Sequence, residues 1–221
     1  MSRGDAVEIG STPKARSGCV PPLGNSHTIL VSLLLLAMLA PLAAAQAPAP
    51  ATAAGGPLEA VLETEHGEIV IRLLAEVAPQ HVRHFAKTAR AGGYDGTTFH
   101  RLIAGGIIQG GDPLSKDPAK AARYGTGGLG LLKAEFSDRP FLRGTVAAAR
   151  RPSSADSGGS QFFICLREQP SLVGQYTVFG EVTAGMDVAD RISTSSVEGD
   201  RPTTRIEIRR VQIREASAGT P

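Results

Sequence analysis

The chain has 221 residues, of which 42% are hydrophobic and only 5% aromatic, and its formal net charge at pH 7 is +2. This length suits one domain plus a targeting segment, and the hydrophobic content is sufficient for a packed core. The small net charge argues against a nucleic-acid-binding protein, which usually carries a strongly basic face. Because Trp is absent, any pocket that needs aromatic side chains must be built from a few Phe and Tyr residues.

The N-terminal region has the layout of a secretory signal peptide. Residues 29–45 read ILVSLLLLAMLAPLAAA, basic residues lie upstream of them, and the three alanines at 43–45 offer a cleavage site. The apolar stretch is short for a bilayer span, which needs about 20 apolar residues, and Pro41 interrupts it. We therefore expect residues 1–45 to be a signal peptide that directs export to the periplasm. An uncleaved anchor, which would place the protein at the membrane, is the alternative.

The rest of the chain divides into a linker, one folded domain and a short tail. Residues 46–57, QAPAPATAAGGP, have the Ala- and Pro-rich composition of a disordered linker. We expect residues 58–216 to fold and residues 217–221 to be a disordered tail. Only Cys165 of the two cysteines follows the signal segment, so no internal disulfide can form. Its apolar neighbours indicate that Cys165 is a small buried side chain.

The folded region is predicted to begin with a β-hairpin and a helix. Residues 69–74 alternate between two faces and should pair with residues 58–64 across a turn at His66-Gly67. Pro79 is suited to the first position of a helix, where its missing N–H costs nothing. Apolar residues at positions 82, 85, 86 and 89 would form the buried stripe of this helix. Gly92-Gly93 should end it.

Short strands and one more helix complete the predicted fold. We expect strands over about 97–103, 107–111, 145–150, 161–166 and 178–182, a helix over about 186–193, and a last strand over 204–214. In the last strand Ile206 and Ile208 share one phase, whereas Val211 and Ile213 share the other. The change of phase predicts a bulge at Arg209-Arg210. Many short strands with two helices indicate a mainly β protein, a β-barrel capped by helices.

Four motifs resemble those of the cyclophilin family, in the same order and at compatible spacings. They are FHR at 99–101 followed by QGGD at 109–112, GTGG at 125–128, GSQFFI at 159–164 and YTVFG at 176–180. The resemblance covers roughly residues 58–215. It implies an eight-stranded antiparallel β-barrel capped by two α-helices. It also implies peptidyl-prolyl cis-trans isomerase activity that needs neither a cofactor nor a metal.

The chemistry of that reaction explains why an arginine is suited to it. An Xaa–Pro bond rotates slowly because the nitrogen lone pair is delocalised into the carbonyl, which gives a barrier of about 18–20 kcal/mol. A catalyst must bind the twisted amide more tightly than either planar form. A donor directed at the prolyl nitrogen would do so, and Arg101 presents several donors on a permanently charged, rigid group. In the family, the arginine of the FHR motif has this catalytic role.

The resemblance assigns further residues to the peptide site. Gln109 and Gln161 match positions that orient the peptide backbone and support the arginine, since an amide offers a donor and an acceptor together. Phe163 matches the aromatic floor of the proline pocket. Ile107 and Leu172 match its apolar walls.

The edge of the expected site is formed by four more residues. Ala149 and the backbone of Arg150 match the strand against which the substrate lies, and Tyr176 matches the pocket edge. His100 adjoins Arg101, and in an alternating strand its side chain would point to the opposite face. We expect a pocket-side or structural role for His100, with no proton chemistry.

The chain departs from the family pattern at Gly106, where relatives carry an aromatic residue on the proline pocket. Loss of that ring would remove roughly 1.5–3 kcal/mol of apolar burial. Two functions are therefore considered for the domain. The first is an active isomerase that acts, as a monomer, on proline-containing unfolded or partly folded polypeptides. The second is a non-catalytic module that binds proline-containing peptides as a chaperone would.

Three other patterns carry weaker functional signals. Residues 125–130 fit GxGxxG, but a dinucleotide site needs a strand before the motif and a helix after it. His81 and His84 lack the spacing and the partners of a helical zinc pair, so we expect solvated histidines. Ser160 could be combined with a histidine and an aspartate as a hydrolase triad, yet the GxSxG motif is absent.

Overall fold

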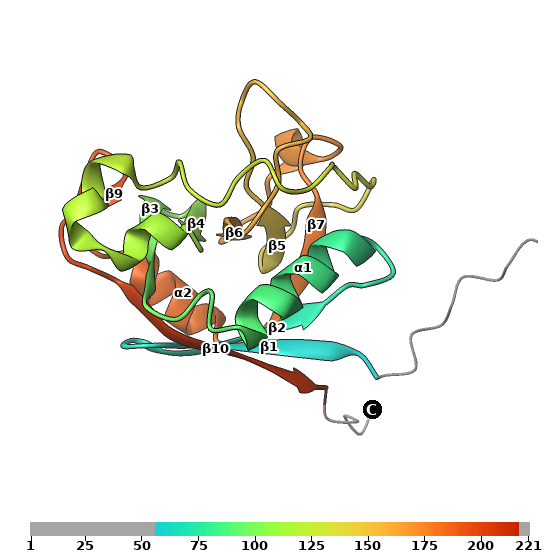
Figure 1. The fold of residues 1–221 in the computed structure, drawn as a ribbon, viewed down its shortest axis with the longest axis horizontal. Helices are drawn as coiled ribbons and strands as arrows, with labels where there is room; N and C mark the ends of the chain where they lie inside the picture. The colour runs from blue at the N-terminus through green and yellow to red at the C-terminus, as the bar shows by residue number, and fades with distance from the viewer. Residues whose placement is uncertain (1–55, 217–221) are drawn as a thin grey trace, which may run out of the picture. The chain divides into compact units, whose positions relative to one another are not determined.

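The computed structural model describes residues 56–216, which form a closed β-barrel (Figure 1). Neighbouring strands are antiparallel, in the order β1-β10-β3-β4-β6-β5-β7-β2. Their bounds are β1 (Leu58–Thr64), β2 (Gly67–Leu73), β3 (Thr97–Ile103), β4 (Ile107–Gly110), β5 (Thr145–Ala148), β6 (Phe162–Cys165), β7 (Val178–Ala184) and β10 (Glu207–Glu215). The predicted eight-stranded antiparallel barrel is therefore confirmed.

Two helices close the core, as predicted. They are α1 (Pro79–Arg90) and α2 (Met186–Ser193), and Figure 1 shows α1 in front of the strands and α2 farther from the viewer. Both helices place apolar side chains in the same core cluster as the inward-facing strand residues, and these are Val82, Phe85 and Ala89 of α1 and Val188, Ala189 and Ile192 of α2. Each helix covers the barrel interior with one apolar face, which is the arrangement expected from its spacing.

The predicted bulge in the last strand is present at Arg209. Glu63 of β1 pairs with Arg210 and the next residue, Thr64, pairs with Ile208, so Arg209 has no partner in β1. Because the extra residue resets the alternation, Ile208 before it and Val211 after it both face the core. The change of phase read from the sequence thus reflects one continuous strand.

Several boundaries and small elements differ from the predictions. β5 ends at Ala148 and β10 begins at Glu207, both shorter than expected. The sequence did not predict the hairpin of β8 (Val197–Glu198) and β9 (Arg201–Pro202), nor the 3₁₀ helices η1 (Pro113–Lys116), η2 (Pro118–Arg123) and η3 (Pro170–Leu172). These elements are too short to show a periodic apolar pattern, so apolar periodicity does not reveal them.

The N-terminal and C-terminal predictions lie largely beyond the described region. The signal peptide at 1–45, residues 46–55 of the linker and the tail at 217–221 are outside residues 56–216. None of the helices within 56–216 has the length and apolar character required to cross a bilayer. Cys165 lies within the described part and is fully buried, and its burial raises the thiol pKa to about 12. The prediction of a buried cysteine is confirmed.

Glu135 caps α1 from the long segment between η2 and β5. The helix has no side-chain cap of its own at Ala78. Instead, the Glu135 carboxylate accepts hydrogen bonds from the backbone N–H groups of Gln80 (3.1 Å) and His81 (3.0 Å). It also lies 2.6 Å from His81 Nδ1, and the His81 side chain is 3% exposed. The expectation that His81 is solvated is therefore wrong: its ring is buried and paired with this carboxylate.

We expect Glu135→Gln to lower the free energy of unfolding by about 1–2 kcal/mol at pH 7, the usual scale for loss of a helix cap. Burial tends to raise the Glu135 pKa, but the hydrogen bonds from the His81 ring and from the Gln80 and His81 amides outweigh it and hold the pKa below its ordinary value. The carboxylate therefore stabilises the fold above its unfolded-state pKa, and this contribution disappears as the pH falls through the lower folded-state value. The difference between wild type and variant should shrink as the pH falls below about 4.

Urea titrations at several pH values would measure this effect. Glu76→Gln is a matched control, because Glu76 is exposed and makes no side-chain contact of this kind. An equal loss of stability at acidic and neutral pH would contradict an electrostatic cap.

Candidate active site

A bulge in β3 turns two consecutive side chains, His100 and Arg101, to the outside of the barrel. Phe99 pairs with Gly110 and Arg101 pairs with Gln109, which leaves His100 without a partner in β4. Phe99 and Leu102 consequently both enter the core, while His100 and Arg101 both line one external cavity. The expectation that His100 and Arg101 lie on opposite faces is wrong, because alternation fails at a bulge.

The register of the sheet aligns residues from neighbouring strands beside that cavity. Arg101 of β3 pairs with Gln109 of β4, Gln109 pairs with Phe163 of β6, and Phe163 pairs with Ala147 of β5. Paired residues of adjacent strands point to the same face. Arg101, Gln109 and Phe163 therefore form a cross-strand row that the backbone hydrogen bonds hold in place.

The cavity has a volume of about 420 Å³ and collects most of the residues singled out from the sequence. The eight that line it are His100, Arg101, Gln109, Ala149, Arg150, Phe163, Leu172 and Tyr176. Gln161 and Ile107 do not line it but lie directly behind the wall. Gln161 is hydrogen-bonded to Gln109, and Ile107 packs in the apolar cluster that contains Phe163.

A chain of polar side chains fixes the guanidinium of Arg101. Its Nε donates to Asp200 Oδ2 at 2.7 Å, and one terminal nitrogen donates to Gln109 Oε1 at 3.4 Å. Gln109 Nε2 donates to Gln161 Oε1 at 3.0 Å, and Gln161 Nε2 donates to the carbonyl of Gly127 at 2.7 Å. The Arg101 side chain is 39% exposed, so the group is anchored on one side and accessible on the other.

The loop that receives Gln161 is itself held by a buried carboxylate. Asp112 is fully buried and accepts hydrogen bonds from the backbone N–H groups of Gly125 (2.5 Å) and Gly127 (3.2 Å). It also accepts one from the N–H of Leu114 (2.7 Å), at the start of η1. A Cβ on Gly127 would lie 2.3 Å from an Asp112 oxygen, so only glycine allows this close approach.

Aromatic rings form the apolar side of the cavity. Phe163 is 3% exposed, and its ring stacks on Phe141 with centroids 6.4 Å apart and meets the edge of Tyr176 at 5.4 Å. Arg150 was expected to contribute through its backbone. In the structure its guanidinium carbon also lies 4.7 Å from the centre of the Tyr176 ring, and its Nε donates to the carbonyl of Gln175. A cation–π contact of this kind steadies the rim of the cavity.

His100 is buried beside Arg101. It is 6% exposed, and neither ring nitrogen has a hydrogen-bond partner in the described part of the chain. Burial lowers its pKa and outweighs the opposing attraction of the Asp112 carboxylate. The lowered pKa favours the uncharged ring at pH 7, and His100 contributes to the wall of the cavity.

Gly106 is not part of the cavity wall. It lies in the turn between β3 and β4, where its N–H donates to the carbonyl of Ile103 and its carbonyl accepts from Leu166. A Cβ at this position would meet Ile103 Cγ2 at 2.9 Å. Glycine at this position therefore does not disturb the row of Arg101, Gln109 and Phe163. Phe163 still forms an aromatic floor for the site.

Five cavity residues were not found from the sequence: Tyr124, Gly125, Pro152, Asp200 and Arg201. Asp200 and Arg201 reach the site because the β8–β9 hairpin lies against β3, where the Asp200 carbonyl accepts from the N–H of Leu102. The segment Gly199-Asp200-Arg201-Pro202 carries a turn signal. Nothing local, however, indicates which strand the turn approaches.

The described residues also bear on the other patterns. Residues 125–130 are loop without a preceding strand or a following helix, which is incompatible with a dinucleotide motif. Among residues 56–216, no three His, Cys, Asp or Glu side chains gather as a metal site would require. Ser160 donates to the carbonyl of Gly111 from the buried side of its loop, so it is not presented as a nucleophile.

Comparisons with known proteins agree with this geometry. The model of the family described as cyclophilin-type peptidyl-prolyl cis-trans isomerase matches residues 60–213. A probable peptidyl-prolyl cis-trans isomerase of Brucella suis is 44% identical over 141 residues, which cover 62% of this chain and 71% of that protein. An isomerase of Arabidopsis thaliana is 35% identical over 164 residues, or 72% of this chain and 95% of that protein.

A solved structure extends the comparison to three dimensions. A cyclophilin-type peptidyl-prolyl cis-trans isomerase of Cryptosporidium parvum, crystallised in the presence of the dipeptide Ala-Pro, matches with a TM-score of 0.63 at 26% identity. The match covers 71% of this chain and 98% of that one. Together with the family match over residues 60–213 and the sequence relatives, this likeness shows that the chain is a peptidyl-prolyl cis-trans isomerase of the cyclophilin family.

Proposed function

We propose that the cavity beside Arg101 binds proline-containing segments of unfolded or partly folded polypeptides and twists their Xaa–Pro bonds through a hydrogen bond from Arg101 to the prolyl nitrogen. The observation that carries this proposal is the cross-strand row of Arg101, Gln109 and Phe163. It sets a charged donor and an aromatic floor side by side on rigid strands. Crystallisation of the Cryptosporidium parvum isomerase in the presence of Ala-Pro supports substrates of this class.

The two sides of the cavity suit the two parts of an Xaa–Pro unit. The pyrrolidine ring is apolar and would pack on Phe163, with Leu172 and Tyr176 beside it. The amide nitrogen of the proline would then face the guanidinium of Arg101. Gln109 would bind the peptide backbone while it holds Arg101, and Ala149 offers backbone along which the substrate can extend.

The expected contribution of Arg101 follows from the energetics of a charged hydrogen bond. Rotation returns the lone pair to the nitrogen, so the nitrogen becomes a good acceptor only in the twisted state. A hydrogen bond to a charged group contributes about 1.5–3 kcal/mol, and each 1.36 kcal/mol changes the rate about tenfold. Arg101 therefore supplies roughly one to two powers of ten. The held, partly desolvated substrate supplies the remainder.

The turnover of a short Xaa–Pro peptide in a protease-coupled assay tests the proposed substrate and site. We expect turnover faster than the spontaneous rate. An excess of a second proline-containing peptide should slow it by competing for the same cavity. Turnover no faster than the spontaneous rate, with peptide binding intact, would instead support a non-catalytic binding module.

Asp200→Ala is expected to lower kcat/KM about two- to fivefold, since an exposed ion pair typically contributes about 1 kcal/mol or less. Asp200 acts as a positioning residue, because its carboxylate holds Nε and turns the other guanidinium nitrogens toward the cavity. The loss should appear in kcat more than in KM, because the interaction of Arg101 is made in the twisted state.

Steady-state kinetics with Asp200→Asn as the conservative variant would test this role. The Asn amide oxygen can still accept from Nε, so partial recovery of kcat is expected. Equal kcat values for the Ala variant and the wild type would remove Asp200 from the mechanism.

We also propose that the protein is bacterial, is exported to the periplasm and acts there as a monomer. The basic N-terminal segment, the apolar stretch at 29–45 and the alanines at 43–45 support export. N-terminal sequencing of the protein recovered from a periplasmic extract would test it, with a new terminus near Gln46 as the expected result. A full-length chain recovered in the membrane fraction would favour an uncleaved anchor.

A further inference from the structure

A second hollow, here called the side pocket, adjoins the active-site cavity. It has a volume of about 210 Å³, and its apolar lining comes mainly from Phe99, Pro118, Ala121, Pro202 and Ile206. These residues belong to β3, to η2 and to the segment that runs from β9 to just before β10, so three parts of the chain that are distant in the sequence build it. None of the residues that line it is an Asp or a Glu. The pocket thus suits an apolar group and does not suit a cation.

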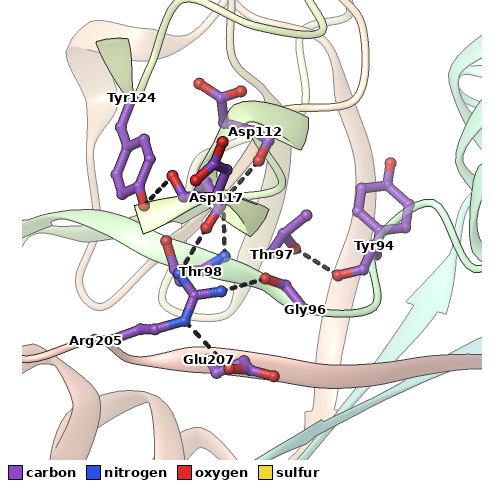
Figure 2. A network of polar contacts seen from close by, with 10 residues as sticks. Tyr94, Gly96, Thr97, Thr98, Asp112, Asp117, Tyr124, Arg205 and Glu207 are labelled. Carbon is purple, nitrogen blue, oxygen red and sulfur yellow. Dashed lines mark hydrogen bonds and ion pairs between the residues drawn. The ribbon is translucent and has the colours of Figure 1, made fainter. Parts of the chain in front are cut away.

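The walls of the side pocket are held in place by the polar network shown in Figure 2. Arg205 donates to the carbonyls of Ser115 (2.7 Å) and Gly96 (2.5 Å), which joins η1 to the segment before β10. Tyr124 Oη donates to the carbonyl of Asp117 at 3.0 Å. Because both Arg205 and Tyr124 line the pocket, these bonds keep it open in the free protein.

The side pocket and the active-site cavity share part of one wall. His100, Tyr124 and Arg201 line both of them. Arg201 is fixed on this wall by a hydrogen bond from a terminal nitrogen to the carbonyl of Ala121 (3.2 Å). A polypeptide whose proline occupies the cavity can therefore place a neighbouring side chain across this wall and into the side pocket.

We propose that the side pocket is a second substrate subsite, which binds one apolar side chain of the polypeptide at a residue near the isomerised proline. The proposal rests on the proposed function of the main cavity. The pocket volume is below the roughly 300–1,000 Å³ usual for small-molecule sites, so a single side chain fits it better than a separate ligand. The substrates favoured are thus polypeptide segments that combine a proline with a nearby large apolar residue, as exposed segments of unfolded proteins do.

The test is a set of short peptides with one Xaa–Pro bond in a Gly- and Ser-rich background, in which a single Leu is moved through the positions on either side. NMR exchange spectroscopy measures the isomerisation rate without a coupling protease. We expect Leu at one position to raise kcat/KM about tenfold through KM, as burial of an apolar side chain would. A rate that is the same for every Leu position would overturn the proposal.

Two variants locate the effect. Ala121→Trp should fill the side pocket and abolish the gain from Leu, while turnover of the peptide without Leu stays unchanged. Ala122→Trp is the matched control, because Ala122 is an exposed residue of the same η2 helix that does not line the pocket. Equal loss of the gain in both variants, or retention of the gain in Ala121→Trp, would contradict the assignment. If Ala121→Trp fails to fold, Thr203→Trp blocks the same pocket from the side of β9.

The outcomes separate this inference from the proposed function. Absence of turnover for all peptides would refute the proposed function itself. Normal turnover without any dependence on the Leu position would refute only the subsite. Sedimentation analysis of the wild type and of Ala121→Trp is a further control. If the wild type is a dimer and the variant a monomer, the pocket binds a second copy of the chain, and the proposal is overturned.

Discussion

Replacement of Arg101 by Ala should lower kcat/KM for an Xaa–Pro peptide by about 10- to 100-fold. This range corresponds to the loss of one charged hydrogen bond of about 1.5–3 kcal/mol, made in the twisted state only. KM should change little, because the planar substrate gains little from the guanidinium. Stability should also change little, since Arg101 is 39% exposed and its ion pair with Asp200 is largely solvated.

The protease-coupled assay measures this loss, and two variants serve as controls. Arg101→Lys keeps the charge but loses the rigid fork that contacts Asp200 and Gln109 together, so an intermediate rate is expected. Arg83→Ala removes an exposed arginine of α1 outside the cavity and should leave the rate unchanged. Wild-type kcat/KM in Arg101→Ala would exclude this residue as the donor and leave the catalytic part of the mechanism without support.

Phe163→Ala is expected to have the largest combined effect, on both stability and substrate binding. Phe163 is 3% exposed and packs against Phe141 and Tyr176. Truncation of a buried Phe typically costs about 3–5 kcal/mol of unfolding free energy. The same change removes the apolar floor under the prolyl ring, so KM should rise roughly 10- to 100-fold, the equivalent of about 1.5–3 kcal/mol of lost burial.

Urea denaturation and steady-state kinetics separate the two effects. Phe141→Ala is the matched control, because Phe141 is fully buried behind Phe163 and does not line the cavity. It should lose comparable stability with a much smaller rise in KM for the folded enzyme. Phe163→Leu should recover part of both quantities. Equal KM values for Phe163→Ala and Phe141→Ala would show that the ring acts only in packing.

Features encoded in short segments could be read from the sequence. The helix beginning at Pro79, the hairpin of residues 58–74 and the bulge at Arg209 follow from local spacing, because apolar periodicity and turn residues act over a few positions. The family motifs located Arg101, Gln109 and Phe163. Strict alternation gave the wrong direction for His100. The bulge in β3 makes His100 an extra residue, so its side chain lies on the same outer face as that of Arg101.

Contacts between distant segments were decided by the tertiary structure. Asp200 lies 99 residues from Arg101 in the chain, and Glu135 lies 54 residues from His81. In each pair, one residue lies in a loop without a periodic pattern. The closed barrel places that loop next to its partner. The side pocket arises in the same way, from η2 and the β8–β9 hairpin.

The sequence by itself therefore determined the family, the barrel and the residues of the cross-strand row, because these depend on short motifs and on the phase of each strand. The tertiary structure alone decided how Arg101 is held, that Gly106 lies outside the cavity, and that a second hollow adjoins the first. The physical reason is that a side chain's partner across the fold depends on where the barrel brings each loop. That position is a property of the closed sheet as a whole and is not encoded in any one segment.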